Sequence, residues 1–220
     1  MPGRKFAVIG LDLAGSPRRP TGFCVLRGLT AKTRDLFLDE EIIAAIAAAG
    51  PDLVAIDAPL RLPPGRTSIH ERNESHYRPC DLELRRRKIP SFPITLGPMR
   101  GLTERGMRLQ AELERKGIRV LEIYPGGAQD ILGIPRAKRD RRGLRRGLEK
   151  LGLKGLRPAA SDHELDAATG AFVGNLFLKG RAEIYGDFTS GAIVMPKAPP
   201  ARGRAKVRVR LKKTRTSFSR

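Results

Sequence analysis

Short apolar runs separated by turn-forming residues occupy the first 58 positions of the chain. The run Lys5–Leu13 is almost continuously apolar, which is typical of a strand buried on both faces of a sheet. Asp39 precedes isoleucines at helical spacing and a stop at Gly50, so this segment predicts a capped helix. The strands expected in this part of the chain are residues 5–13, 21–26, 30–38 and 53–56.

The pattern becomes irregular between residues 59 and 100, where seven prolines are interspersed with many arginines. This composition predicts a long insertion loop with one short helix near residues 81–87, and long ordered loops are usually functional. Ser161 and Glu164 have the capping-box pattern that opens a helix. The other expected elements are helices at 103–116, 139–151 and 161–178, a strand at 118–124, and a hairpin or edge strand at 186–196.

The order of these elements predicts the topology of the sheet. Three consecutive strands are followed by two strand-to-strand crossovers through helices, and right-handed crossovers place the first, fourth and fifth strands side by side. The expected fold is therefore α/β, with a mixed five-stranded sheet in the order 3-2-1-4-5 flanked by helices, which is the ribonuclease H-like topology. Residues 1–196 are expected to form this domain, with 59–100 as its insertion and 197–220 as a basic, flexible tail.

Composition adds a partner class to this picture. A chain of 220 residues with 40% hydrophobic content can bury a core as one domain. Its formal net charge is +20, of which the ten Lys and Arg of residues 197–220 supply half. Such a charge favours nucleic acid (DNA or RNA), because each neutralised phosphate releases counterions, although a solvated basic surface is the alternative. The tail lacks an amphipathic helical face, so a membrane partner is not expected.

Two features indicate a reducing compartment. Cys24 and Cys80 lie far apart in a chain large enough to fold without crosslinks, so both are interpreted as reduced thiols. The first apolar stretch is interrupted by Asp12 and fits neither a signal peptide nor a spanning helix. A cytoplasmic location is therefore expected.

Carboxylates stand where chemistry is expected. Asp12 and Asp57 each follow an apolar strand, and neighbouring parallel strands bring those ends together. Asp162 and Asp166 are one turn apart at the start of the last predicted helix, so both can project from one side. Glu122 lies on the strand beside that of Asp57 and faces either this cluster or solvent.

Acids gathered in this way need a cation, because burying like charges together is costly. Carboxylate oxygens favour Mg²⁺ or Mn²⁺, and a pair of such ions supports phosphodiester hydrolysis without a nucleophilic side chain. The predicted metal ligands are Asp12, Asp57, Asp162 and Asp166. The predicted catalytic residues are Asp12, Asp57, Glu122 and Asp166.

Several of these residues have simpler explanations. Asp often caps the loop after a strand, and an acid such as Asp162 in a first helical turn complements the helix dipole. His163 is either a proton shuttle beside the cluster or a surface residue. Arg78 and Arg85 are candidates to bind substrate phosphate, or belong to a solvated charge run. A zinc site at His70, His76 and Cys80 lacks a fourth ligand at close spacing.

The chain resembles a family of proteins predicted to be nucleases with a ribonuclease H fold, domain of unknown function 429. The resemblance implies a nuclease, and it adds Asp81 and Lys138 to the predicted substrate-binding residues. Where family members carry His-Pro-Glu, this chain has Tyr124-Pro125-Gly126, which removes a possible ligand near Glu122. The matching stretches are Gly10–Gly15, Ala55–Pro59, Arg78–Asp81, Glu122–Pro125, Lys138 with the basic helix after it, and Asp162–Ala167, the last of which is also similar to the closing helix of Holliday-junction resolvases.

Three functions remain open from the sequence. The first is a metal-dependent nuclease of DNA or structured RNA. The second is a non-catalytic nucleic-acid-binding protein of the same fold, in which the basic loop and tail bind. The third is a phosphotransferase of the actin-like superfamily, which is disfavoured because those enzymes pair two such domains and this chain has length for one.

Overall fold

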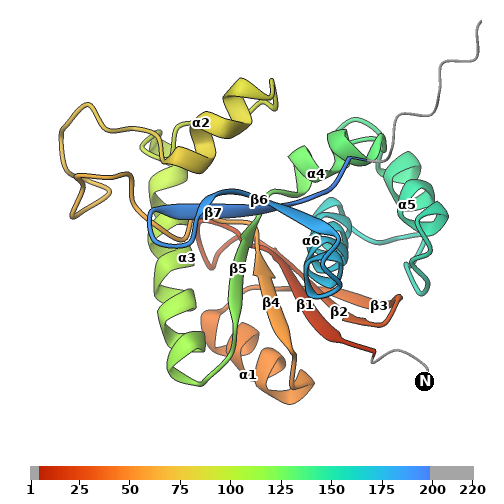
Figure 1. The fold of residues 1–220 in the computed structure, drawn as a ribbon. Helices are drawn as coiled ribbons and strands as arrows, with labels where there is room; N and C mark the ends of the chain where they lie inside the picture. The colour runs from red at the N-terminus through yellow and green to blue at the C-terminus, as the bar shows by residue number, and fades with distance from the viewer. Residues whose placement is uncertain (1–4, 199–220) are drawn as a thin grey trace, which may run out of the picture.

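A computed structural model describes residues 5–198 of the chain (Figure 1). These residues form a seven-stranded sheet in the order β3-β2-β1-β4-β5-β7-β6. Strands β1, β4, β5 and β7 are parallel, whereas β2, β3 and β6 pair antiparallel with their neighbours. The strands are β1 Ala7–Asp12, β2 Thr21–Arg27, β3 Thr30–Leu36, β4 Leu53–Ile56, β5 Val120–Ile123, β6 Ala182–Asp187 and β7 Gly191–Pro196.

The predicted ribonuclease H-like order 3-2-1-4-5 is confirmed, and two further strands extend the sheet beyond β5. Every residue of β7 is buried, and its register with β5 pairs Glu122 with Ile193 and Ile123 with Val194. The predicted hairpin is therefore present but begins earlier, at Ala182; its second strand, β7, is interior, and β6 forms the edge. The prediction of five strands was incomplete, because parallel pairing with a distant strand has no local sequence signature.

Helices cover both faces of the sheet (Figure 1). Helices α1 and α3 pack on one face, and α4, α5 and α6 pack on the other. Strand residues alternate between the two sides, so that Ile9 and Leu11 face α1 and α3 while Val8 faces α6. The helices are α1 Asp39–Ala49, α2 Pro79–Arg86, α3 Gly97–Arg115, α4 Pro125–Leu132, α5 Arg141–Lys150 and α6 Asp162–Leu178.

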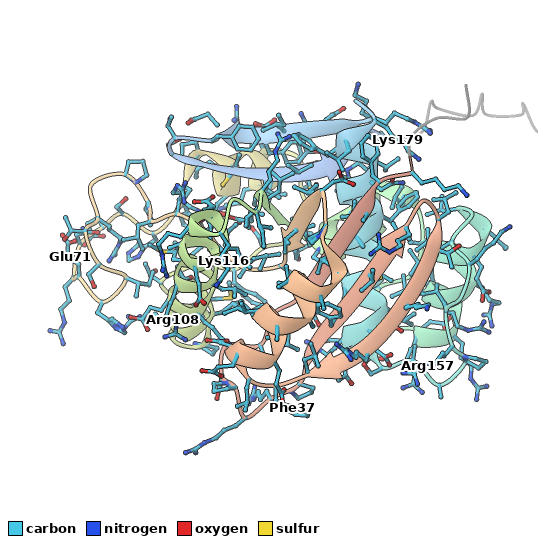
Figure 2. The ribbon with its side chains drawn as sticks, turned by 90° about the horizontal axis from the view of Figure 1, so that it is seen from below. Phe37, Glu71, Arg108, Lys116, Arg157 and Lys179 are labelled. Carbon is cyan, nitrogen blue, oxygen red and sulfur yellow. The ribbon has the colours of Figure 1, made fainter. Side chains whose placement is uncertain are left out.

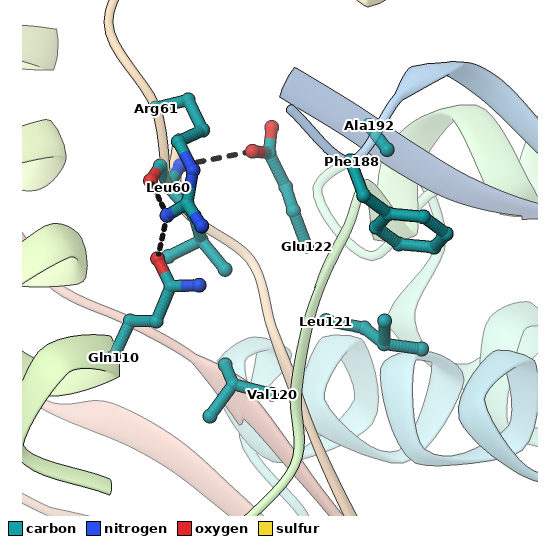
Figure 3. Close-up of a pocket in the computed structure, with 8 residues that line it drawn as sticks. All are labelled: Leu60, Arg61, Gln110, Val120, Leu121, Glu122, Phe188 and Ala192. Atoms are coloured by element: carbon teal, nitrogen blue, oxygen red, sulfur yellow. Dashed lines mark hydrogen bonds between the residues drawn. The ribbon is translucent and has the colours of Figure 1, made fainter. Parts of the chain in front are cut away.

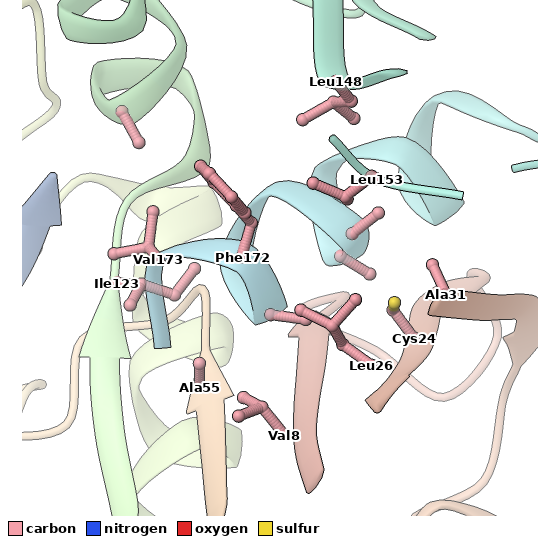
Figure 4. Close-up of a cluster of buried hydrophobic side chains, with 14 of the residues drawn as sticks. Val8, Cys24, Leu26, Ala31, Ala55, Ile123, Leu148, Leu153, Phe172 and Val173 are labelled. Atoms are coloured by element: carbon pink, nitrogen blue, oxygen red, sulfur yellow. The ribbon is translucent and has the colours of Figure 1, made fainter. Parts of the chain in front are cut away.

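The larger hydrophobic cluster lies between the sheet and α6 (Figure 4). Val8, Leu26 and Ala55 of the strands are fully buried against this side, and Val173 of α6 is equally buried. Complete burial of a Val or Leu side chain stabilises a fold by about 1.5–3 kcal/mol. Cys24 belongs to the same cluster, and burial raises the pKa of its thiol, so Cys24 behaves here as a small apolar residue.

Helix α6 lies unusually close to the first two strands. A Cβ added at Gly10 would lie 2.0 Å from the carbonyl oxygen of Ala167, and one added at Gly22 would lie 1.9 Å from that of His163. Only glycine permits these approaches, since such distances are far inside van der Waals contact. The two glycines thus bring the start of α6 directly over the ends of β1 and β2.

Three local expectations need correction. Helix α3 begins at Gly97, earlier than predicted, with Pro98 accommodated in its first turn. Helix α4 was not predicted, because Pro125 followed by two glycines is typical of a turn. Asp39 is the first residue of α1 rather than its cap, and its carboxylate pairs with Arg105 Nε of α3 at 2.7 Å.

The insertion between β4 and α3 has an outer loop and an inner helix. Figure 2 shows the outer loop, with Glu71 on it, projecting beside α3. Arg66 closes this loop by donating hydrogen bonds to the carbonyl oxygens of Glu71, Asn73 and Ser75. The inner part contains α2, which packs against the β6–β7 hairpin. The predicted tail beyond residue 198 lies outside the described residues.

Candidate active site

The first two candidate acids are brought together by the parallel pairing of β1 and β4. Leu11 pairs with Ile56, so the next residue of each strand, Asp12 and Asp57, stands at the same edge of the sheet. The Asp57 amide also donates a hydrogen bond to Leu11 O at 2.8 Å, which continues the pairing one residue further. The side chain of Asp12 is 17% exposed, so this edge is accessible.

The start of α6 contributes the remaining acids. Ser161 caps the helix by accepting from the Glu164 amide, and Glu164 accepts from the Ser161 amide, so the predicted capping box is confirmed. Asp162 and Asp166 then face the carboxyl edge of the sheet, one turn apart. Asp162 is 42% exposed at the rim, whereas Asp166 is mostly buried.

A cavity of about 460 Å³ lies over these carboxylates. Its walls include Asp12, Asp57, Asp162 and Asp166 together with residues of the 59–100 insertion. Carboxyl ends of parallel strands are the usual place for ligand sites in open α/β sheets. The structure therefore collects the four predicted metal ligands around one space that is large enough for a ligand.

The acids in this cavity repel one another. Burial raises the pKa of Asp57 well above its usual 3.8, and the charges of Asp12 and Asp166 raise it further. Among residues 5–198, no hydrogen bond to Asp57 lowers its pKa. Burial, followed by the charge of Asp12, raises the pKa of Asp166 to about 7. In the metal-free protein, Asp57 and Asp166 therefore hold their protons to a higher pH than ordinary aspartates, because ionising all the acids together is unfavourable.

Two neighbouring side chains bind Asp12 and Asp166. His163 Nδ1 lies 2.6 Å from Asp12 Oδ2, and this contact raises the pKa of His163. Gln129 Nε2 of α4 donates to Asp166 Oδ1 at 2.6 Å and to Thr169 Oγ1 at 3.1 Å. Sequence reasoning missed Gln129 because it missed α4.

The donor set fits a divalent cation in composition. Carboxylate oxygens are the ligands that Mg²⁺ and Mn²⁺ prefer, and a cation would relieve the repulsion at Asp57 and Asp166. Across residues 5–198, however, no three His, Cys, Asp or Glu side chains are already arranged to hold one metal ion. Metal binding would therefore require side-chain movement, with an ion replacing His163 at Asp12 or Gln129 at Asp166.

Glu122 is engaged in a buried ion-pair network. Arg78 Nη1 lies 2.6 Å from Glu122 Oε2 and Nη2 lies 2.7 Å from Oε1, while Asp81 binds the other edge of the same guanidinium. The Leu60 amide also donates to Glu122 at 2.9 Å (Figure 3). Burial raises the pKa of Glu122, although Arg78 opposes this effect. The network joins the insertion to β5 beside Asp57.

Figure 3 shows a second, much smaller cavity, which Leu60 and Glu122 of this network help to line. Its volume is about 40 Å³, and Arg61 bridges it by donating to Gln110 Oε1 at 2.7 Å. This space is too small for a substrate.

The predicted substrate-binding residues occupy different positions. Arg78 and Asp81 line the main cavity, but they bind each other and are almost fully buried. Lys138 also lines it and is exposed. Arg85 is not part of the cavity wall, and its guanidinium lies over the Tyr77 ring, 4.6 Å from the centroid. Arg136 lines the cavity and was not singled out from the sequence.

Two other expectations concern the surface and the histidines. In the part of the chain that the structure covers, no helix is long and apolar enough to cross a membrane.

His70 contacts Glu104 at 2.8 Å and His76 contacts Thr95 at 2.8 Å, so these histidines do not converge on Cys80. The zinc alternative has no support among residues 5–198.

The strand order, with helices on both faces of the sheet, defines an α/β protein of the ribonuclease H-like type. Residues 10–190 match the family described as "Protein of unknown function (DUF429)", and the chain belongs to this family. A comparison with curated proteins finds no match. Two solved structures of RuvC from Thermus thermophilus, one in complex with Holliday junction substrate, are each 16% identical to this chain. Each match spans 79% of this chain and 96% of the RuvC chain. The TM-score is 0.42 for the complex with the Holliday junction and 0.44 for the other RuvC structure.

Proposed function

We propose that this protein is a divalent-metal-dependent nuclease that hydrolyses phosphodiester bonds in DNA or structured RNA. The observation that carries the proposal is the set of acids from β1, β4 and α6 in one cavity. Asp57 and Asp166 both have raised pKa values there, because both are buried and the acids repel one another. Neutral side chains at these positions would not have this energetic cost, so the cluster is a candidate functional site.

Asp12, Asp57 and Asp166 would hold the metal, with Asp162 at the rim. Bound there, divalent ions would supply an activated water and stabilise the leaving oxygen of the phosphodiester. In the metal-free protein His163 and Gln129 hold Asp12 and Asp166 beside the cavity, and at least one of these two contacts would give way to the metal. His163 is also placed to exchange a proton with solvent, because its side chain is 46% exposed.

Glu122 has a supporting role in this proposal. Its carboxylate is held by Arg78 and the Leu60 amide, so it fixes the segment after β4 on which Asp57 stands. Lys138 places an exposed cationic group in the cavity wall, where it would bind the phosphates of a nucleic acid. Arg136 lines the same wall and would contribute through the part of its guanidinium that Asp130 does not bind. The net charge of +20 favours the same partner.

The test compares the wild-type chain with Asp12→Asn and with the control Glu40→Gln. Glu40 is exposed on α1, on the opposite side of the sheet from α6. Calorimetric titration with Mn²⁺ and Mg²⁺ should show binding at roughly micromolar to low millimolar levels, and this binding should disappear in Asp12→Asn. Cleavage of a panel of DNA and RNA substrates should disappear with it, while nucleic-acid affinity stays nearly unchanged.

Two outcomes would overturn the proposal. Equal cleavage by wild type and Asp12→Asn would show that the carboxylate cluster is not catalytic. Binding of nucleic acid with no cleavage of any substrate in Mn²⁺ would favour the non-catalytic alternative, in which the acids do not support a reaction.

A further inference from the structure

The insertion contributes a second set of residues to the main cavity. Phe92 lines it and is 69% exposed, more than any other large apolar side chain in residues 5–198. Ile94, Met99 and Leu102 line the same cavity, so Phe92 belongs to an apolar part of its wall. Exposing a phenylalanine to water is unfavourable, and an exposed aromatic ring in a cavity wall indicates a ligand that covers it.

The segment that carries Phe92 is held in place by β5 and its own neighbours. Tyr124, directly after β5, donates a hydrogen bond from its hydroxyl to Pro90 O at 2.6 Å. Arg136 in turn donates to the Tyr124 hydroxyl at 3.2 Å. Ile94 is 1% exposed and anchors the other end of the segment. The segment is therefore tied to the residue that follows β5, and its exposed ring lines the same cavity as Asp12 and Asp57.

The residue before Phe92 has an unused polar group. Ser91 also lines the cavity, and its hydroxyl oxygen is buried without a hydrogen-bond partner among the described residues. A buried hydroxyl without a partner costs free energy, and such groups usually find their partner in a ligand or water. An exposed aromatic ring and a hydroxyl without a partner among the described residues thus lie on consecutive residues, and rotation about the Ser91 Cα–Cβ bond would turn the hydroxyl towards the cavity that the residue lines.

We propose that Ser91 and Phe92 form a subsite for an unpaired nucleobase, which stacks on the Phe92 ring and hydrogen-bonds to the Ser91 hydroxyl. This inference rests on the proposed function, because the nearby Arg136 and Lys138 are taken to bind the backbone of the same nucleic acid. Stacking on aromatic side chains requires a base that has left its duplex stack. The preferred substrate is therefore single-stranded, or carries an unpaired nucleotide, rather than a continuous duplex.

The experiment measures binding of oligonucleotides that contain the fluorescent base 2-aminopurine, in buffer with Ca²⁺ to separate binding from cleavage. Wild type, Phe92→Ala, Phe92→Tyr and the control Phe37→Ala are compared on single-stranded, bulged and fully paired substrates. Phe37 is 44% exposed just after β3 and does not line the cavity. Stacking should change the 2-aminopurine signal in wild type and Phe92→Tyr. Phe92→Ala should lose this change and bind single strands about tenfold more weakly.

The outcomes separate the subsite from the nuclease proposal. If Phe92→Ala keeps the affinity, the signal and the preference for unpaired substrates of wild type, the subsite is absent whatever the cleavage assay shows. The nuclease proposal survives that result if Asp12→Asn still abolishes cleavage. If the wild-type chain binds continuous duplex as tightly as single strands, the inferred substrate class is wrong.

Discussion

Replacing Asp166 with Asn should stabilise the metal-free protein at alkaline pH. The pKa of Asp166 is raised from 3.8 to about 7, so the folded protein keeps its proton over a range in which the unfolded chain loses it. Folded stability therefore falls as pH rises from about 4 to about 7, and stays lower above that range. At 1.36 kcal/mol for each pH unit, the ionised carboxylate costs ~4 kcal/mol at pH 8. Asn removes this charge and keeps an oxygen for the Gln129 hydrogen bond.

The assay is thermal or urea unfolding of wild type, Asp166→Asn and Glu40→Gln in EDTA, between pH 4 and pH 8. At pH 8 the Asp166→Asn protein should melt about 10 °C higher than wild type, whereas the two should coincide near pH 4. Glu40→Gln should change stability by less than about 1 kcal/mol at any pH. Mn²⁺ should raise the stability of wild type at pH 8 and leave Asp166→Asn almost unchanged. Equal stabilities of wild type and Asp166→Asn at pH 8 in EDTA would show that the ionised Asp166 carboxylate does not destabilise the folded protein.

Two further predictions concern the framework of the site. Arg78→Met should destabilise the fold by about 3–5 kcal/mol in urea unfolding, because it leaves Glu122 buried without its partner; a loss under about 1 kcal/mol would mean that the network is not important for stability. Gly10→Ala should cost about 1–3 kcal/mol or more, since the new methyl group overlaps Ala167 O, whereas Gly97→Ala meets no neighbour within 4 Å and serves as its control. Equal stabilities of these two glycine variants would contradict the close packing of α6 on β1.

Much of the fold was predictable because it depends on local patterns and on one topological rule. Apolar runs marked β1 and β4, and right-handed crossovers placed them side by side, so the proximity of Asp12 and Asp57 followed from backbone geometry. The capping box at Ser161 marked the start of α6 within a residue.

The missed features depend on contacts between distant segments. Pro125-Gly126-Gly127 is typical of a turn, yet it forms the first turn of α4, where Gly127 leaves room for Tyr124 and Met195. Missing this helix also meant missing the donor that Gln129 supplies to Asp166. The pairing of Arg78 with Glu122 spans 44 positions, and no sequence pattern distinguishes it from a solvated charge.

The outer loop of the insertion offers a place for a reporter dye. Arg66 binds carbonyl oxygens of the loop itself, so the conformation of the loop depends little on the cavity wall formed by α2 and β5. Arg72 is exposed on this loop, so a fluorophore attached at an Arg72→Cys position would leave the carboxylates and the Phe92 segment untouched. Both native cysteines are buried, which makes labelling selective for the new thiol. The same closed loop should also tolerate a tag for immobilisation, so that single molecules of the protein can be observed as substrates arrive and leave.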